Sequence, residues 1–260
     1  MIDLHTHVLP GIDDGPEDTV GSVAMAHLAS ERGTGTLVAT PHVRDDYPKV
    51  KPDEIQDRAR SLNRLVRDYG IDVFIVPGAE IDLTTAMKLS DEDLRLVTLG
   101  GNGRDLLIET PYSRVPDIFE SMLETVMERG FRVTLAHPEL NQGFQENPER
   151  LGALAEDGVL VQLTTSSFTR RRRSASRRTA SLALERGWVS VLATDAHSPE
   201  WRAPDLNPGV QAARRLLPDA EAEIEWMVND APLAIVQGRE LPERPEREQL
   251  SGWQRLRRRA

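Results

Sequence analysis

The first fourteen residues, MIDLHTHVLPGIDD (residues 1–14), decide how the rest of the chain is interpreted. Residues 1–4 predict a short buried strand. Side chains two positions apart share a face of a strand, so His5 and His7 point to the same side. Residues 10–11 predict a turn, which brings Asp13 and Asp14 next to the strand end. Two imidazoles and a carboxylate suit a borderline metal ion, although a His-x-His pair also arises by chance on half-exposed strands.

The positions of the other histidines favour the metal interpretation. His42, His137 and His197 each follow a short aliphatic run, at residues 37–39, 133–135 and 189–192. Two further runs, 73–76 and 106–108, lead to Glu80 and Glu109. Such runs are typical of buried parallel strands. Strand ends that repeatedly carry His, Asp or Glu predict one shared site, although each of these residues singly is more often an ordinary core, loop or surface residue. His27 lies outside the pattern, in mid-helix, and is interpreted as a structural or surface residue.

Alternating strands and helices predict an α/β fold with a parallel sheet. The predicted strands are 1–4, 36–40, 71–76, 105–109, 132–136, 159–164 and 189–193; the predicted helices are 17–32, 52–69, 115–129, 147–156, 174–186 and two or three within 209–236, with a short helix and loop in 83–103. A barrel brings the carboxyl ends of all strands together, whereas an open sheet spreads them apart. We therefore expect a single barrel domain over residues 1–238. Residues 239–260 are charged and predict a flexible tail.

Composition excludes several classes of function. The chain has 260 residues and a formal net charge of -10 with a pI near 5.2, which argues against nucleic acid as a partner. No apolar run is long enough to span a bilayer and no signal peptide is evident, so we expect no membrane insertion and a cytoplasmic location. Cysteine is absent, which excludes disulfides, Cys-ligated metals and a cysteinyl-phosphate intermediate.

Seven motifs in order carry a resemblance to a known family: residues 5–7 (HTH), 11–15 (GIDDG), 39–42 (ATPH), 77–80 (PGAE), 108–111 (IETP), 136–139 (AHPE) and 194–197 (TDAH). They resemble the PHP superfamily, and more closely the bacterial manganese-dependent protein-tyrosine phosphatases of capsular and exopolysaccharide biosynthesis. The resemblance covers about residues 1–238. It implies a distorted seven-stranded (β/α) barrel that holds three divalent metal ions, with Mn²⁺ expected and Fe, Zn or Co as alternatives.

The resemblance also implies which residues hold the metals. His5, His7 and Asp195 hold one ion, which Glu80 bridges to a second ion held by Glu109 and His137; Asp14, His42 and His197 hold the third. A metal-bridging hydroxide then attacks the phosphorus of phosphotyrosine. The implied partner is a phosphorylated tyrosine kinase, whose tail controls exopolysaccharide synthesis, or another phosphoprotein. The oligomeric state stays open.

The substrate side follows the family less closely. Arg202 matches an arginine that binds phosphate in the family, while Leu140 stands where the family carries a second arginine. Arg44 is a further cationic candidate, and Asp195 or a metal-bound water is a candidate proton donor. The basic run 170–173 offers a hypothetical replacement for the charge missing at Leu140. A solvated loop or helix start explains Arg44 and the basic run equally well or better.

Three alternatives to the protein phosphatase remain open. The first is a PHP phosphoesterase that acts on a small ester such as histidinol phosphate, which Leu140 favours. The second is amidohydrolase chemistry. The absence of a lysine at a strand end that could be carboxylated argues against it. The third is a metal-free module that binds a kinase tail, which the full set of nine ligand-type residues disfavours.

Overall fold

A computed structural model describes residues 1–248. Its strands are β1 (Ile2–Thr6), β2 (Thr36–Ala39), β3 (His42–Val43), β4 (Phe74–Pro77), β5 (Glu80–Asp82), β6 (Asp105–Glu109), β7 (Arg132–Ala136), β8 (Leu160–Thr164) and β9 (Val191–Ala193). Its α-helices are α1 (Thr19–Glu31), α2 (Ile55–Asp68), α3 (Leu83–Lys88), α4 (Asp91–Leu96), α5 (Phe119–Glu128), α6 (Gln142–Glu146), α7 (Glu149–Glu156), α8 (Ser166–Thr169), α9 (Ala175–Arg186), α10 (Asn207–Leu216), α11 (Glu221–Val228) and α12 (Asp230–Val236). Three 3₁₀ turns are η1 (Pro52–Glu54), η2 (Leu99–Gly101) and η3 (Pro138–Leu140).

The strands are parallel and form two sheets, ordered β1-β2-β4 and β3-β5-β6-β7-β8-β9. Backbone hydrogen bonds link the sheets at two places. The Asp195 N–H donates to the His5 carbonyl (2.9 Å), and the Glu80 N–H donates to the Pro41 carbonyl (3.2 Å). The predicted α/β class with a parallel sheet is confirmed. Because the strand pairings divide into two sheets, the closed seven-stranded barrel itself stays a prediction.

The second and third predicted strands form as β2 and β4. Two short strands that were not predicted follow them and shape the site: β3 after a break at residues 40–41, and β5 after a break at residues 78–79. Proline has no N–H to donate to a ladder, so Pro41 ends the pairing of β2. Beyond the breaks, β3 and β5 pair with His42 opposite Glu80. The two interruptions therefore set two predicted metal ligands side by side.

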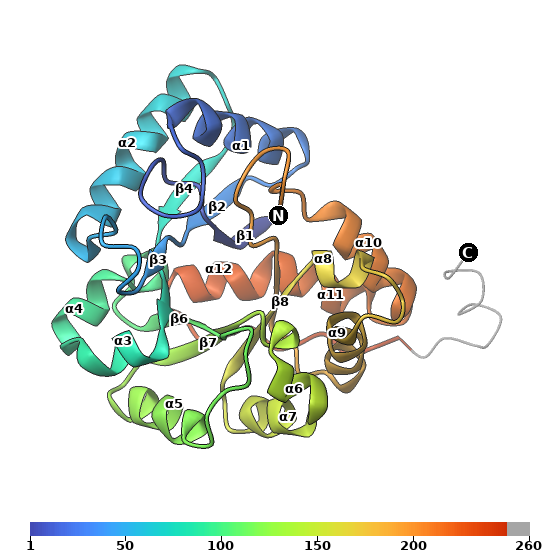
Figure 1. Ribbon diagram of the computed structural model, residues 1–260. Helices are drawn as coiled ribbons and strands as arrows, with labels where there is room; N and C mark the ends of the chain where they lie inside the picture. Colours follow the sequence, from blue (N-terminus) through green and yellow to red (C-terminus); the bar gives the residue numbers. More distant parts are fainter. Residues whose placement is uncertain (249–260) are drawn as a thin grey trace.

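The predicted helices lie outside the strands (Figure 1). α1 begins where the Asp18 carboxylate accepts a hydrogen bond from the Gly21 N–H (2.9 Å), as expected of an N-cap. α2 buries one stripe of side chains at helical spacing, namely Ile55, Ala59, Leu62 and Val66. Short helices α6 and α8 also form, although the sequence predicted no helix there. They are too short to show a periodic pattern.

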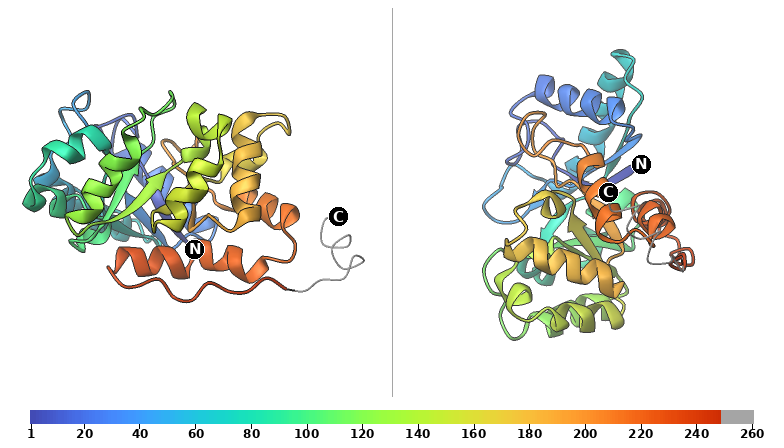
Figure 2. Two further views of the ribbon diagram at one scale, coloured as in Figure 1. Left: turned by 90° about the horizontal axis from the view of Figure 1, so that it is seen from below. Right: turned by 90° about the vertical axis from the view of Figure 1, so that its right-hand side faces the viewer.

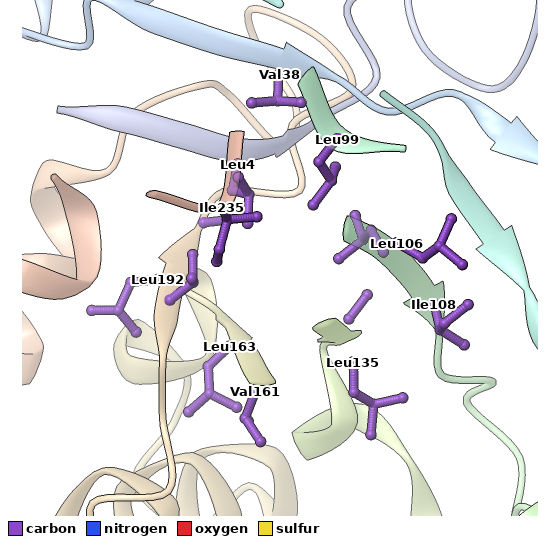
Figure 3. Close-up of a cluster of buried hydrophobic side chains, with 14 of the residues drawn as sticks. Leu4, Val38, Leu99, Leu106, Ile108, Leu135, Val161, Leu163, Leu192 and Ile235 are labelled. Atoms are coloured by element: carbon purple, nitrogen blue, oxygen red, sulfur yellow. The ribbon is translucent and has the colours of Figure 1, made fainter. Parts of the chain in front are cut away.

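One continuous hydrophobic cluster runs through the described residues. Figure 3 shows aliphatic side chains from different strands that meet between the sheets. Leu4 of β1, Leu106 of β6, Leu163 of β8 and Leu192 of β9 are all fully buried. Ile235 of α12 joins them and is likewise fully buried. The strands thus share one core, as expected of a single domain.

Helix α12 covers the amino-terminal end of the strands, away from the predicted site (Figure 2). The Asn102 amide, just before β6, donates to the Ile235 carbonyl (2.6 Å). At Gly100 a Cβ atom would lie 2.1 Å from the Val236 carbonyl oxygen, so only glycine fits there. None of the helices within residues 1–248 is long and apolar enough to cross a lipid bilayer.

Residues 239–248 belong to the predicted tail but make defined contacts. Arg244 and Arg247 reach the carboxylate of Glu223 on α11, at 3.1 Å and 2.6 Å. The Glu223 side chain is only 2% exposed, so these two arginines balance a buried charge. The expectation of a loose tail therefore does not hold for residues 244–247. Residues 249–260 lie outside the described residues.

Candidate metal centre

The strand ends bring all nine predicted ligand side chains together. In four groups, one possible ligand atom from each member lies within 4.8 Å of the others: His7, Asp14, His42 and His197; His5, His7 and Glu80; His5, His137 and Asp195; and His42, Glu80 and Glu109. The grouping of Asp14, His42 and His197 is the one expected. Glu109, however, lies with His42 rather than with His137, and His137 lies with His5 and Asp195. The histidine outside the cluster, His27, has a side chain 59% exposed, as expected of a surface residue.

Two side chains orient the imidazoles of β1. His5 Nδ1 donates to Gln162 Oε1 on β8 (3.0 Å), and His7 Nδ1 donates to Asp13 Oδ2 (2.9 Å). Each Nδ1 therefore carries a proton, which leaves Nε2 as the atom available to a metal ion. The two Nε2 atoms lie 3.2 Å apart and face each other. A metal-ligating histidine usually donates its other ring N–H to a carboxylate or a carbonyl oxygen, which holds the ring in place.

The loop that follows β1 folds back onto His7. A Cβ atom at Gly15 would lie 2.2 Å from the His7 carbonyl oxygen, so this close approach requires glycine. The Asp13 carboxylate accepts hydrogen bonds from the Gly15 N–H (3.0 Å) and the His42 N–H (3.2 Å) as well as from His7. Asp13 thus ties the loop, β1 and β3 together, and holds Asp14 beside His7 and His42. The sequence interpretation of Asp13 as a turn residue missed this function.

The arrangement around Glu80 tests whether a metal ion fits. Glu80 Oε2 lies 3.1 Å from His42 Nδ1, 3.2 Å from His5 Nε2 and 3.4 Å from His7 Nε2. It is buried, yet it has no hydrogen-bond partner within residues 1–248, because none of these nitrogens is aligned to donate to it. A buried carboxylate oxygen normally has a partner. The other oxygen, Glu80 Oε1, pairs with His137 Nε2 (2.8 Å), so only Oε2 lacks a partner among the described residues. A buried carboxylate oxygen without a partner, surrounded by imidazole nitrogens, fits a shared divalent cation such as Mn²⁺, Fe²⁺, Zn²⁺ or Co²⁺.

The charges of the cluster are strongly coupled. Burial alone would raise the pKa of the Glu80 carboxyl group, but His5 and His137 hold that pKa well below its usual range. Burial alone would lower the pKa of His137, but Glu80 and Asp195 raise that pKa to about 9. The pKa of His7 is also raised well above its ordinary value, by Asp13, Asp195 and Glu80 against the effect of burial. The ionised carboxylates thus favour protonation of the imidazole nitrogens. A metal ion competes with these protons for the same nitrogens.

Three residues of this site have left-handed backbone. Among the described residues, the non-glycine residues with positive φ are His137 (37°), Asp195 (56°) and Arg202 (54°). Left-handed backbone is uncommon for residues other than glycine, and it tends to occur where function requires a side chain to point in a set direction. All three are predicted site residues. The strain supports the prediction that these side chains are positioned for function.

Both candidate phosphate-binding arginines lie at the cluster. Arg44 Nη1 donates to both carboxylate oxygens of Glu109, at 2.7 Å and 2.9 Å. The Arg202 guanidinium contacts Asp195 and lies 3.2 Å from His197 Nε2. Leu140, at the end of η3, has no positive charge to replace the family's second arginine. Arg44 and Arg202 line the central cavity, but the basic run 170–173 does not, which argues against that run as a replacement for the missing arginine.

Seven of the nine cluster residues line a cavity of about 710 Å³, namely Asp14, His42, Glu80, Glu109, His137, Asp195 and His197. The lining also includes further charged residues, among them Asp45, Asp46 and Asp82, and several apolar ones. No lysine lines the cavity in the described part of the chain, so it offers no residue for a carboxylated lysine. The cavity also includes Tyr112, whose ring lies parallel to that of His137 with the centroids 5.9 Å apart. No pattern in the sequence indicates Tyr112, since it lies in a loop after a strand end.

A parallel α/β fold with a cluster of imidazoles and carboxylates at its strand ends defines a metal-dependent hydrolase. The chain belongs to the family described as "Capsular polysaccharide synthesis, CpsB/CapC", whose model matches residues 1–234.

Known relatives agree with this assignment. The chain is 32% identical over 206 residues to the tyrosine-protein phosphatase YwqE of Bacillus subtilis, covering 78% of this chain and 79% of that protein. It is 26% identical over 213 residues to the tyrosine-protein phosphatase CpsB of Streptococcus pneumoniae, covering 78% and 86%. A crystal structure from work on YwqE and CpsB, described as unique metal-dependent tyrosine phosphatases, superposes with a TM-score of 0.80 at 26% identity. It covers 96% of this chain and 100% of that one. The predicted family is confirmed.

Proposed function

We propose that this chain is a metal-dependent phosphatase that hydrolyses phosphotyrosine on a protein. The observation that carries the proposal is the crowding of imidazole nitrogens around Glu80 Oε2, a buried oxygen without a hydrogen-bond partner in the described residues. Membership of the CpsB/CapC family and the names of its relatives support the choice of substrate. The site geometry and the family membership are both independent of the fold class, which by itself is shared by proteins of many unrelated activities.

The nine side chains suit three divalent ions, with Mn²⁺ as the proposed metal. Asp14, Glu80, Glu109 and Asp195 contribute four negative charges against the six positive charges of three such ions, so a net charge of +2 remains for a phosphate dianion. Bound ions would acidify a water molecule into a nucleophile and neutralise charge on the phosphoryl group. Gln162 and Asp13 would hold the ligand rings of β1 in place for this purpose.

Arg44 and Arg202 are the proposed phosphate-binding side chains. Each guanidinium lies at a carboxylate of the cluster, Glu109 or Asp195, so each is close to the position that a phosphoester would take. The planar guanidinium can hold two phosphate oxygens at once. Asp195 is better suited to be a ligand and an anchor for Arg202 than a proton donor. Burial alone would raise the pKa of its carboxyl group, but His5, His7, His137 and Arg202 hold that pKa below its ordinary value. A phenoxide leaves without strong acid assistance.

The proposed partner is a phosphorylated bacterial tyrosine kinase whose tail presents the phosphotyrosine, and the proposed place of action is the cytoplasm. The family description, which refers to capsular polysaccharide synthesis, supports a substrate of that pathway. Histidinol phosphate is the competing substrate, since Leu140 removes one cationic phosphate contact.

One panel of assays tests the proposal. Purified protein with Mn²⁺ is offered a phosphotyrosine peptide and histidinol phosphate, alongside variants His7→Ala and His27→Ala. We expect hydrolysis of the phosphotyrosine peptide, a loss of at least about a hundred-fold in His7→Ala, and parental activity in the surface control His27→Ala. Preference for histidinol phosphate would transfer the assignment to small esters. Equal activity of His7→Ala and the parent would contradict the metal mechanism.

A further inference from the structure

Tyr112 occupies a distinctive position beside the metal cluster. It lies in the connection between β6 and α5, and its ring is parallel to the His137 ring, with an interplanar angle of 5° and a centroid distance of 5.9 Å. The side chain is nevertheless 57% exposed, and it lines the central cavity. An aromatic ring that rests on a ligand imidazole and remains accessible is available to a second ring, because offset-parallel pairs form at centroid distances of about 4.5–7 Å.

The loop that carries Tyr112 is fixed by its neighbours. The side-chain amide of Asn141 donates to the carbonyls of Pro111 (2.7 Å) and Ser113, one on each side of Tyr112. The Gln142 N–H donates to the carbonyl of Tyr112 itself (3.2 Å). Asn141 is fully buried, so these hydrogen bonds are shielded from water. The position of the tyrosine is therefore built into the fold at the segment that follows η3.

The cavity that Tyr112 lines also has apolar lining residues, here called the apolar wall. They are Leu83, Pro111, Pro116, Phe119 and Met122. None of these side chains can bind phosphate or metal, and Leu83 and Phe119 are nearly buried, at 5% and 3% exposure. A cavity lined by both charged and apolar side chains suits a ligand with one anionic end and one apolar end.

We propose that Tyr112 and this apolar wall form a subsite for the aryl group of the substrate, and that Tyr112 is the residue that selects aryl over alkyl phosphate esters. The proposal rests on the proposed function, because it assumes that the phosphoryl group lies on the cluster between Arg44 and Arg202. The substrate ring then lies against Tyr112, and the wall excludes water from its other atoms. An alkyl ester such as phosphoserine leaves this wall uncovered.

The test compares binding and turnover in Tyr112→Ala, Tyr112→Phe and the control Tyr69→Ala. Tyr69 is a similarly exposed tyrosine, 67% exposed, at the end of α2 and outside the cavity. Binding of phenylphosphonate and methylphosphonate to the Mn²⁺-loaded proteins is measured by calorimetry. We expect Tyr112→Ala to weaken phenylphosphonate about ten-fold and methylphosphonate less than about two-fold, with Tyr112→Phe and Tyr69→Ala close to the parent. Michaelis constants for phosphotyrosine and phosphoserine peptides should shift in the same way.

The outcomes separate this proposal from the proposed function. Equal weakening of both phosphonates in Tyr112→Ala would show that the tyrosine only supports His137, and would overturn the subsite. Unchanged binding of both would overturn it as well. If phenylphosphonate loses its advantage in Tyr112→Ala while the parent hydrolyses no phosphate ester, the aryl subsite stands and the phosphatase assignment falls.

Discussion

The substitution Asp13→Asn probes the support of the metal centre without touching a predicted ligand. Asp13 Oδ2 accepts from His7 Nδ1 (2.9 Å) and from the His42 N–H (3.2 Å), while Oδ1 accepts from the Gly15 N–H (3.0 Å). Asparagine has one acceptor oxygen, so in either orientation its NH₂ group faces a donor. At least one buried donor loses its acceptor, at a cost of about 1–3 kcal/mol.

The same change disturbs the ligand itself. If the new NH₂ group faces His7, the ring accepts through Nδ1 and carries its proton on Nε2, where no metal ion can then bind. Loss of such a supporting group typically lowers metal affinity about 10- to 100-fold. We therefore expect Asp13→Asn to weaken Mn²⁺ binding by about that factor and to lower the free energy of unfolding by about 1–3 kcal/mol.

The assay is a competition titration of Mn²⁺ against a chromophoric chelator, together with chemical denaturation. Asp18→Asn is the matched control, because Asp18 caps α1 through the Gly21 N–H and asparagine caps a helix as well as aspartate does. The control should match the parent in both measurements. Parental Mn²⁺ affinity in Asp13→Asn would refute the argument that Asp13 orients His7.

Three further predictions follow from the packing and the charges. Gly209→Ala would place a Cβ atom 2.5 Å from the Thr165 carbonyl oxygen, so chemical denaturation should show a free energy of unfolding lower by about 1–3 kcal/mol. Gly35→Ala faces open space and should show no such loss. Equal stability of the two variants would contradict this packing. The double variant Arg244→Ala/Arg247→Ala leaves the buried Glu223 carboxylate without its two guanidinium partners and should cost about 3 kcal/mol or more, against less than about 1 kcal/mol for Arg60→Ala in an exposed pair. A double variant as stable as Arg60→Ala would show that these two arginines do not stabilise the buried Glu223 charge. Leu140→Arg puts an arginine three residues after His137, where the family carries one. It should lower the Michaelis constant for a phosphotyrosine peptide about ten-fold, and a constant that rises or stays the same would show that the position does not face the substrate.

The sequence predicted the parts of the fold that depend on local pattern. Short aliphatic runs mark the strands, and the stripe of Ile55, Ala59, Leu62 and Val66 marks the inner face of α2. Parallel strands end on one side, which predicted a shared site for the His, Asp and Glu motifs, and the resemblance to the family implied which nine side chains make it up. The short strands β3 and β5, beyond Pro41 and Gly78, were not predicted, since strands of two or three residues carry no readable alternation.

The remaining features depend on contacts between distant segments. Asp13 looks like a turn residue in the sequence, and its function emerges only when the loop folds back so that Gly15 approaches the His7 carbonyl. Tyr112 likewise gains its position from Asn141, almost thirty residues further along the chain. The charged segment 239–248 looked like a tail because its contacts are mostly ion pairs and hydrogen bonds of charged side chains, such as those of Arg244 and Arg247 with Glu223, and leave no apolar periodicity.

Diffraction from crystals grown with Mn²⁺, measured for anomalous scattering, tests the central claim most directly. The account predicts three anomalous peaks enclosed by the nine imidazole and carboxylate side chains, with one of them adjacent to Glu80 Oε2 and the Nε2 atoms of His5 and His7. A map without any peak among these side chains, from protein that is folded and saturated with Mn²⁺, would contradict it.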